Sequence, residues 1–233
     1  MNIKYFFAAL CTSVLFFGCA TNQNFFTQEP KQSEAEINVT LKDPSANGND
    51  ITVIIPVPSQ ENIFTRVPVS RQIFARGTKN EKELIAFFTA HCPKHNHFRA
   101  RQLARLYIQE CAAEGINSDI AFVQMCHETN FLRFGNLVKK EWNNFCGLGA
   151  ISAEQPGLRF KTMRLGVRAH VQHLHAYATT EDIALKNKLV DPRYKYVRPR
   201  GKATTIQGLA GTWAADKAYS EKLEKYLCEL EKL

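Results

Sequence analysis

Amphipathic segments with helix-capping signals constrain the fold of this chain most strongly, and they begin at Asn80. Glu83 follows Asn80 by three residues, which is the pattern of a capping box at a helix N-terminus. Apolar residues then recur at helical spacing, which predicts helices over about 81–92, 98–114, 119–132 and 167–178, and from about 216 onward. A loop rich in Gly and Asn, with some extended character, separates the third and fourth helices at about 135–161. The pattern predicts a mainly α (α+β) domain over 80–233, with a small β or irregular lobe after the third helix.

Helix boundaries within this domain also have local signals. Gly115 follows the second helix and is typical of a C-terminal cap, while Asn117 or Ser118 is suited to cap the third. No internal repeat stands out. We therefore expect one helical domain rather than a repeat array.

The first residues resemble a secretory signal. A basic start with Lys4 precedes an apolar run from Tyr5 to Phe17, which is too short to span a bilayer as a helix. The run 15–19, LFFGC, resembles a bacterial lipobox, in which Cys19 becomes the lipid-bearing first residue. We predict a signal peptide over 1–18 and a lipid-anchored flexible tether over 19–79, with one short strand at Ile51–Ile55. An ordinary signal peptide with an incidental cysteine is the alternative.

Net charge indicates the kind of partner, and the cysteine count indicates the state of the thiols. The chain carries a formal net charge of +8, which indicates an anionic partner. Because the first residues resemble a secretory signal, that partner is expected in the cell envelope, and nucleic acid is not expected. Five cysteines remain after Cys11 and Cys19, an odd number without a CxxC motif, so they are expected to be mostly buried thiols.

Glu128 is the residue that needs explaining, because it lies in the apolar stretch 124–132, QMCHETNFL. Helical spacing puts Glu128 on one face with Ala121 and Met125, near the C-terminal end of the third helix. Burial and the helix dipole both disfavour its charged form, so its pKa is expected to be raised. A carboxyl group that keeps its proton suits the general acid of a glycosidase. Spacing alone equally allows a structural glutamate paired with Arg133 or Arg101.

Four ordered segments resolve this ambiguity in favour of a glycosidase. They are DIAFVQMCHETNFLRFG, NNFCGLGA, GVRAHVQHLHAYAT and LAGTWAADKAYSEKL. Together they resemble the bacterial peptidoglycan glucosaminidases of glycoside hydrolase family 73, over about residues 80–233. The resemblance implies a lysozyme-like helical domain with a substrate groove beside a small β lobe. It also implies hydrolysis of the β-1,4 bond after N-acetylglucosamine in peptidoglycan, without a cofactor.

The resemblance also assigns roles to individual positions. Glu128 corresponds to the general acid, and Tyr219 to the tyrosine beside it. The turn that floors the sugar groove corresponds to Asn143, Asn144, Phe145 and Gly147. Trp213 is expected either to stack on a sugar or to belong to the core. Glu154 is the candidate second carboxylate, with Glu141 and Asp216 as alternatives.

One departure from the family pattern affects the groove. The sequence reads Glu-Thr-Asn-Phe-Leu at 128–132, where the family commonly has Glu-Ser-Gly-Trp-Gly. The rim of the groove and its preference among sugar subsites therefore stay open. Inverting, retaining and substrate-assisted mechanisms all stay open as well.

Other chemistries fit the sequence less well. His170, His173 and His175 do not share one helix face, and Phe131 stands where an HExxH motif needs its second histidine, so we predict no metal site. Cys126 and His127 are adjacent on a helix and cannot face each other as nucleophile and base, which disfavours a cysteine hydrolase of wall peptides. A non-catalytic wall-binding lipoprotein on the same fold is the remaining alternative, although such a binder would not need Glu128.

Overall fold

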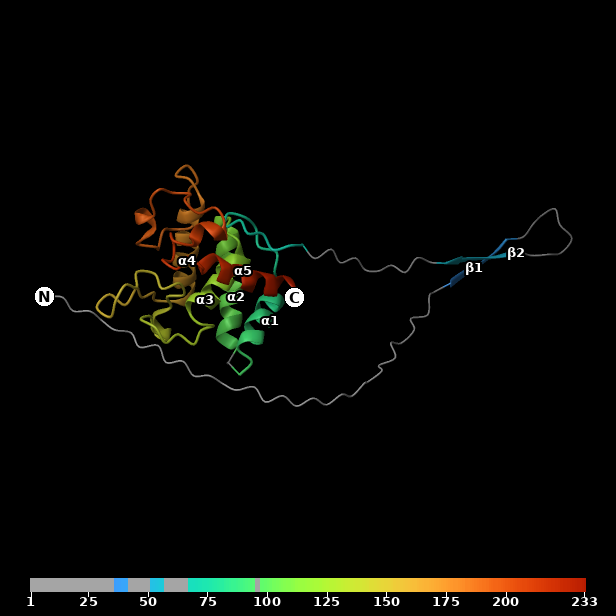
Figure 1. Ribbon diagram of the computed structural model, residues 1–233, viewed down its shortest axis with the longest axis horizontal. Helices are drawn as coiled ribbons and strands as arrows, with labels where there is room; N and C mark the ends of the chain where they lie inside the picture. The colour runs from blue at the N-terminus through green and yellow to red at the C-terminus, as the bar shows by residue number, and fades with distance from the viewer. Residues whose placement is uncertain (1–35, 42–50, 57–66, 95–96) are drawn as a thin grey trace, which may run out of the picture. The chain divides into compact units, whose positions relative to one another are not determined.

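The computed structural model describes residues 36–41, 51–56, 67–94 and 97–233 (Figure 1). The chain divides into two units, Met1–Ile63 and Phe64–Leu233. The predicted signal peptide, Cys19 and much of the predicted tether lie outside the described residues. No helix in the described ranges has the length and apolar character needed to cross a membrane.

The described part of the first unit is a pair of antiparallel strands. Strand β1 (Glu36–Leu41) pairs with β2 (Ile51–Pro56), with Glu36 opposite Pro56 and Leu41 opposite Ile51. Strand β2 covers the segment expected to be extended. Strand β1 was not expected, although Ile37, Val39 and Leu41 alternate with polar residues, which is the signal of a strand.

The second unit is mainly helical, as expected. Its helices are α1 (Glu81–His91), α2 (Phe98–Glu114), α3 (Ser118–Glu128), α4 (Met163–Ala178) and α5 (Tyr219–Glu231). Three short 3-10 helices lie in its loops: η1 (Lys140–Trp142), η2 (Tyr194–Tyr196) and η3 (Ile206–Leu209). Residues 129–162, between α3 and α4, form the predicted irregular lobe, in which an isolated bridge joins Ala150 to Pro156.

The helix boundaries follow the local capping signals. The Asn80 side chain accepts hydrogen bonds from the backbone of Lys82 and Glu83, and the Glu83 carboxylate accepts one from the Asn80 N–H, which completes the capping box. Gly115 ends α2 with a φ of 71°, in the left-handed region that favours glycine. Asn117, rather than Ser118, caps α3.

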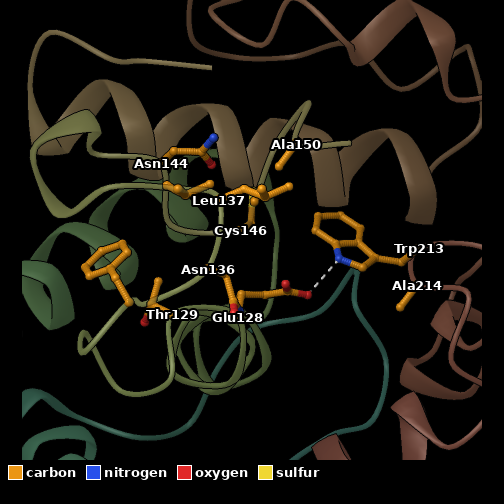
Figure 2. A pocket seen from close by; sticks show the side chains of 12 residues that line it. Glu128, Thr129, Asn136, Leu137, Asn144, Cys146, Ala150, Trp213 and Ala214 are labelled. Atoms are coloured by element: carbon orange, nitrogen blue, oxygen red, sulfur yellow. Dashed lines mark hydrogen bonds between the residues drawn. The ribbon is translucent and has the colours of Figure 1, made fainter. Parts of the chain in front are cut away.

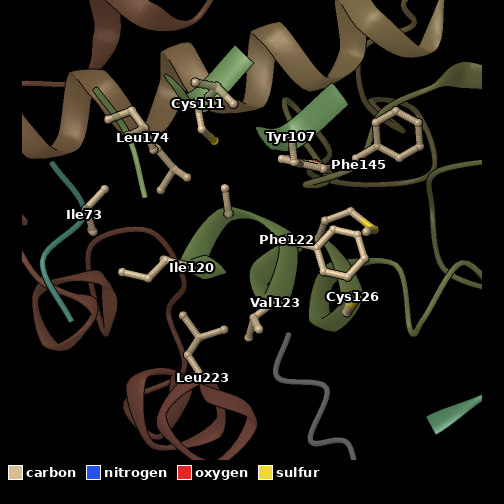
Figure 3. Close-up of a cluster of buried hydrophobic side chains, with 14 of the residues drawn as sticks. Ile73, Tyr107, Cys111, Ile120, Phe122, Val123, Cys126, Phe145, Leu174 and Leu223 are labelled. Atoms are coloured by element: carbon tan, nitrogen blue, oxygen red, sulfur yellow. The ribbon is translucent and has the colours of Figure 1, made fainter. Parts of the chain in front are cut away.

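Helix α3 is the centre of this unit. It contacts α1, α2, α4 and α5, and every residue from Ser118 to Cys126 is buried. Figure 3 shows side chains of α3, among them Phe122 and Val123, between Leu174 of α4 on one side and Leu223 of α5 on the other. Because α3 is enclosed on all sides, its sequence is apolar around most of its circumference.

Helix α3 ends at Glu128, four residues before the predicted end. Asn130, Phe131 and Leu132 all have positive φ, between 48° and 61°, so the chain turns sharply away from the helix axis. Such backbone is strained for residues other than glycine and persists only when packing enforces it. The packing is present, because Phe131 stacks on His91 and Leu132 is 1% exposed. The apolar residues after Glu128 therefore belong to the core without belonging to the helix.

Residues 67–79 pack onto the helical unit, although sequence analysis placed them in the tether. Val69 and Ile73 are buried in the main core. The Asp119 carboxylate at the start of α3 accepts hydrogen bonds from the backbone N–H groups of Thr78 (2.7 Å) and Lys79 (3.1 Å). This segment is therefore part of the scaffold that holds α3.

Candidate active site

Glu128 is the last residue of α3, and two aromatic side chains hold its carboxyl group. The Tyr219 hydroxyl, at the start of α5, donates to Glu128 Oε1 at 2.5 Å, and Trp213 Nε1 donates to the same oxygen at 3.0 Å. Figure 2 shows the carboxyl group turned toward the Trp213 indole. No arginine takes part in these hydrogen bonds: Arg133 bonds instead to Asn130 and to the His91 carbonyl.

Glu128 Oε2 lies beside a cavity of about 300 Å³, which we call the Glu128 cavity. A Cβ atom placed on Gly147 would lie 3.9 Å from Oε2, so the Gly147 backbone passes close to this oxygen. Among the residues that line the cavity are Glu128, Asn144, Cys146, Gly147, Ala150 and Trp213. In Figure 2, Asn144, Cys146 and Ala150 lie across from Glu128. One carboxyl oxygen is thus fixed by protein donors while the other is directed to a space that a ligand can enter.

The environment of Glu128 favours a protonated carboxyl group. Burial raises the pKa of Glu128, and the hydrogen bonds from Tyr219 and Trp213 lower it by less, so the pKa stays above its ordinary value. Both donors point at Oε1, and an indole N–H cannot accept a proton. When Glu128 is neutral, its proton is therefore expected on Oε2, the oxygen that faces the cavity.

A chain of buried hydrogen bonds extends inward from Glu128. Gln124 Nε2 donates to the Tyr219 hydroxyl at 2.9 Å, and Gln124 Oε1 lies 3.0 Å from His170 Nε2. His170 Nδ1 in turn lies 2.8 Å from the Tyr107 hydroxyl. We call Gln124, His170 and Tyr107 the inner relay. It connects α2, α3, α4 and α5 to one carboxyl oxygen.

The chemistry of the inner relay fixes its direction. An amide oxygen only accepts, so His170 Nε2 must carry the hydrogen, and Nδ1 must accept from Tyr107 when the ring is neutral. Burial lowers the pKa of His170 to about 3, which keeps the ring neutral. Each donor therefore points along the chain toward Glu128, and Gln124 prevents the Tyr219 hydroxyl from turning away.

The turn after η1 shapes the far side of the cavity. The Asn144 side chain is buried, donates to the Leu148 and Leu158 carbonyls and accepts from the Leu148 N–H. Gly147 has a φ of 64°, which suits glycine where the chain turns past Glu128. On α4, a Cβ on Gly166 would lie 1.8 Å from the Asn143 carbonyl oxygen, so only glycine lets this turn approach α4 so closely.

The structure brings some of the predicted site residues together. Glu128, Asn144, Gly147 and Trp213 line one cavity, and Tyr219 is bonded to Glu128. Phe145 is 0% exposed and belongs to the core. Asn143 bonds to the Phe160 carbonyl and accepts from Arg99.

The candidates for a second carboxylate lie elsewhere. Glu154 is exposed and accepts a hydrogen bond from the Ser152 hydroxyl at 2.7 Å, Glu141 is exposed, and Asp216 pairs with Lys222 at 2.6 Å. None of the three lines the Glu128 cavity. Glu128 is the one carboxylate among the lining residues that the structure describes.

Sequence analysis missed the inner relay. Gln124 precedes Glu128 by one helical turn, which was a usable signal that both side chains share a face. Sequence analysis considered His170 as a metal ligand, and nothing in its spacing relates it to Gln124. The partners come from α2, α3 and α4, and only the packing of these helices brings them into contact.

Cysteine and metal chemistry find little support at this site. Burial raises the pKa of the Cys126 and Cys146 thiols well above the ordinary value, so neither is suited to act as a thiolate nucleophile. The described cysteines from Cys92 onward are all free thiols. Within the described ranges no group of three or more His, Cys, Asp or Glu side chains is placed to hold a metal ion.

We predict that Tyr219→Phe raises the pKa of Glu128 further, because it removes a donor that stabilises the charged carboxylate. The midpoint of the Glu128 titration, followed by the ¹³C shift of its side-chain carboxyl, should move to higher pH. Tyr226→Phe is the matched control on α5, since Tyr226 packs on Phe131 instead. A midpoint that stays in place or moves to lower pH in Tyr219→Phe would contradict the assigned hydrogen bond.

Comparison with known proteins identifies a family model and a relative that are similar to this chain. The family model for mannosyl-glycoprotein endo-beta-N-acetylglucosaminidase, named Glucosaminidase, matches residues 104–232, more than half of the chain. An uncharacterized protein of Borreliella burgdorferi (strain ATCC 35210 / DSM 4680 / CIP 102532 / B31) is 40% identical over 196 residues, which cover 84% of this chain and 92% of the relative. No solved structure matches the chain. With Glu128, Trp213 and Tyr219 all inside the matched region, this chain belongs to the glucosaminidase family.

Proposed function

We propose that this protein hydrolyses the β-1,4 glycosidic bond after N-acetylglucosamine in peptidoglycan, with Glu128 as the general acid. Family membership supports a glycoside hydrolase that acts on peptidoglycan. The role of Glu128 as general acid rests on the environment of its carboxyl group. It is mostly buried, its pKa is raised, and its unpaired oxygen faces a cavity.

In the proposed reaction, Glu128 Oε2 gives its proton to the bridging oxygen as the bond from C1 to that oxygen breaks. The negative charge that develops on Glu128 is stabilised by the donors already aimed at Oε1, from Tyr219 and Trp213. These two hydrogen bonds lower the pKa of Glu128 by less than burial raises it. The arrangement therefore keeps the acid protonated before the reaction and stabilises the anion afterwards.

Substrate contacts are proposed for the residues around Glu128. Trp213 is partly exposed at the cavity wall, which suits an aromatic contact with a sugar. Asn144 holds the backbone of the opposite wall, and Gly147 leaves room beside Oε2. Asn143 and Phe145 are proposed to act indirectly, by supporting this wall.

Glu154 remains the proposed second carboxyl group. It lies in the turn 150–157, whose first residue, Ala150, lines the Glu128 cavity. Because Glu154 itself is exposed, its role requires this turn to move over the cavity when glycan binds, as loops of many enzymes do. If the turn does not move, the 2-acetamido group of the substrate is the remaining internal nucleophile.

We also propose that the protein works in the cell envelope as a lipoprotein. The support is the lipobox-like run that ends at Cys19, together with a substrate class that lies outside the cytoplasm.

Glu128→Gln is expected to lower the rate of glycan cleavage by about 10²- to 10⁴-fold, the usual contribution of a general acid. The melting temperature should stay close to that of the wild type, since an uncharged amide replaces an uncharged carboxyl group. New reducing ends from purified peptidoglycan, identified by mass spectrometry, are the measurement.

Glu221→Gln is the matched control for this variant, since Glu221 is exposed on α5 and lies outside the cavity. Wild-type activity in Glu128→Gln would remove the acid assignment. Cleavage of wall peptides instead of glycan by the wild-type protein would favour a peptide hydrolase.

Glu154→Gln is expected to slow glycan cleavage by at least about tenfold without changing the melting temperature, if Glu154 reaches the substrate. The same reducing-end assay measures this, again against Glu221→Gln. Full activity in Glu154→Gln would exclude Glu154 and favour participation by the acetamido group.

Cys19→Ser is expected to move the protein from the membrane fraction to the soluble fraction of cells, because the thiol that carries the lipid is lost. Detergent partitioning and mass spectrometry of the N-terminus test this. Continued membrane partitioning of the variant would argue against the anchor.

A further inference from the structure

A second, smaller cavity of about 210 Å³ adjoins the Glu128 cavity. The two share four lining residues: Cys146, Gly147, Ala150 and Trp213. The second cavity adds His173, Tyr177 and Arg193, so we call it the His173 cavity. The Trp213 ring lies against the His173 ring, with 5.2 Å between centroids, while its N–H bonds to Glu128. One indole therefore separates Glu128 from His173.

His173 is held with one nitrogen toward the cavity. Its Nδ1 lies 2.7 Å from Asp191 Oδ2, and Asp191 Oδ1 accepts the Arg193 N–H at 2.8 Å. The Asp191 side chain is 0% exposed, whereas 11% of the His173 side chain is accessible. A ring whose Nδ1 donates to a buried carboxylate presents Nε2 on its accessible edge.

The charges around the His173 cavity favour an anion. Arg193 is exposed at the wall, and no ion pair in the described part of the chain engages its guanidinium. The Lys202 ammonium lies 4.6 Å from the centroid of the ring of Tyr177, which lines the cavity. Both Asp191 oxygens are bonded within the protein, and Asp191 is not among the residues that line the cavity, so its carboxylate is not presented to a ligand there.

We propose that the His173 cavity binds a carboxylate of the peptide attached to the glycan strand. This rests on the proposed function, since the neighbouring Glu128 cavity then holds a sugar. Sugar rings of the strand are uncharged, whereas its peptides carry carboxylates. The cavity is smaller than the usual site for a whole ligand, so it suits a substituent better than another sugar. The guanidinium group of Arg193, which lines the cavity, can form strong charge-assisted hydrogen bonds to a carboxylate.

The experiment compares two forms of one substrate: peptidoglycan strands with intact peptides, and the same strands with peptide carboxylates capped as methylamides. Capping removes the negative charge and keeps the peptide. For the wild-type protein, KM should be about tenfold higher on capped strands, with kcat little changed. His173→Gln and Arg193→Gln should each raise KM on intact strands by a similar factor and leave KM on capped strands unchanged.

Lys195→Gln is the matched control, since Lys195 is an exposed cation of the same segment that lies against Tyr196 and not in the cavity. Because Arg193 is exposed, Arg193→Gln is expected to fold normally. It therefore tests the proposal even if His173→Gln misfolds. Equal KM values for wild type on both strands would overturn the proposal. An equal loss on both strands in His173→Gln and Arg193→Gln would also overturn it and would indicate a role in the chemistry or in folding.

Binding separates this proposal from the proposed function. Calorimetry with the Glu128→Gln protein should show tighter binding of intact strands than of capped strands, whether or not the wild-type protein cleaves them. If the protein binds intact strands more tightly than capped strands but the wild type cleaves neither, only the hydrolase proposal is contradicted. Equal binding of both strands would end the carboxylate proposal alone. Free acetate at millimolar concentration should not compete, and full competition by acetate would show a site for small anions instead of the peptide.

Discussion

The enclosure of one carboxyl group at the end of a buried helix is the constraint on which the rest of the structure depends. Helix α3 is surrounded by α1, α2, α4 and α5, and Glu128 is its last residue. Burial therefore disfavours the charged form of the carboxyl group, and the helix C-terminus adds a dipole that also disfavours negative charge. A general acid needs such surroundings, and a solvent-exposed glutamate on the same helix would lose its proton far below neutral pH.

The core tolerates the Glu128 carboxyl group because the buried polar side chains around it all have hydrogen-bond partners. The inner relay of Gln124, His170 and Tyr107 forms a directed series of hydrogen bonds that ends at Tyr219 and Glu128 Oε1. Buried polar networks destabilise a core when a member lacks a partner, and they fix one arrangement when each member has one. Here the network determines which oxygen of Glu128 stays free for the cavity.

Trp213 connects the functional parts of the molecule. Its N–H bonds to Glu128, its ring lies against His170 and His173, and it lines both cavities. The irregular lobe completes the cavity walls, with Asn144 holding its turn in place. Helices thus fix the position of Glu128, while the loops around them supply the shape of the cavity.

The sequence by itself determined the features that depend on local interactions. Asn80 caps the start of α1 and Gly115 caps the end of α2, and both caps depend only on nearby backbone. These two boundaries therefore fall where the residues indicate. Glu128 stood out because a carboxylate in an apolar helix is costly wherever that helix packs. The family motifs added Tyr219 and Trp213, whose bonds to Glu128 no spacing rule provides.

Only the tertiary structure decided where distant residues meet. The early end of α3 follows from the packing of Phe131, which overrides its helical pattern. The pairing of Gln124 with His170, and of His173 with Asp191, joins residues far apart in the sequence. Such contacts leave no periodic signal, because they depend on how helices pack rather than on the propensity of any one segment. The sequence therefore singled out Glu128 as the candidate acid, and the fold decided which of its oxygens faces the cavity.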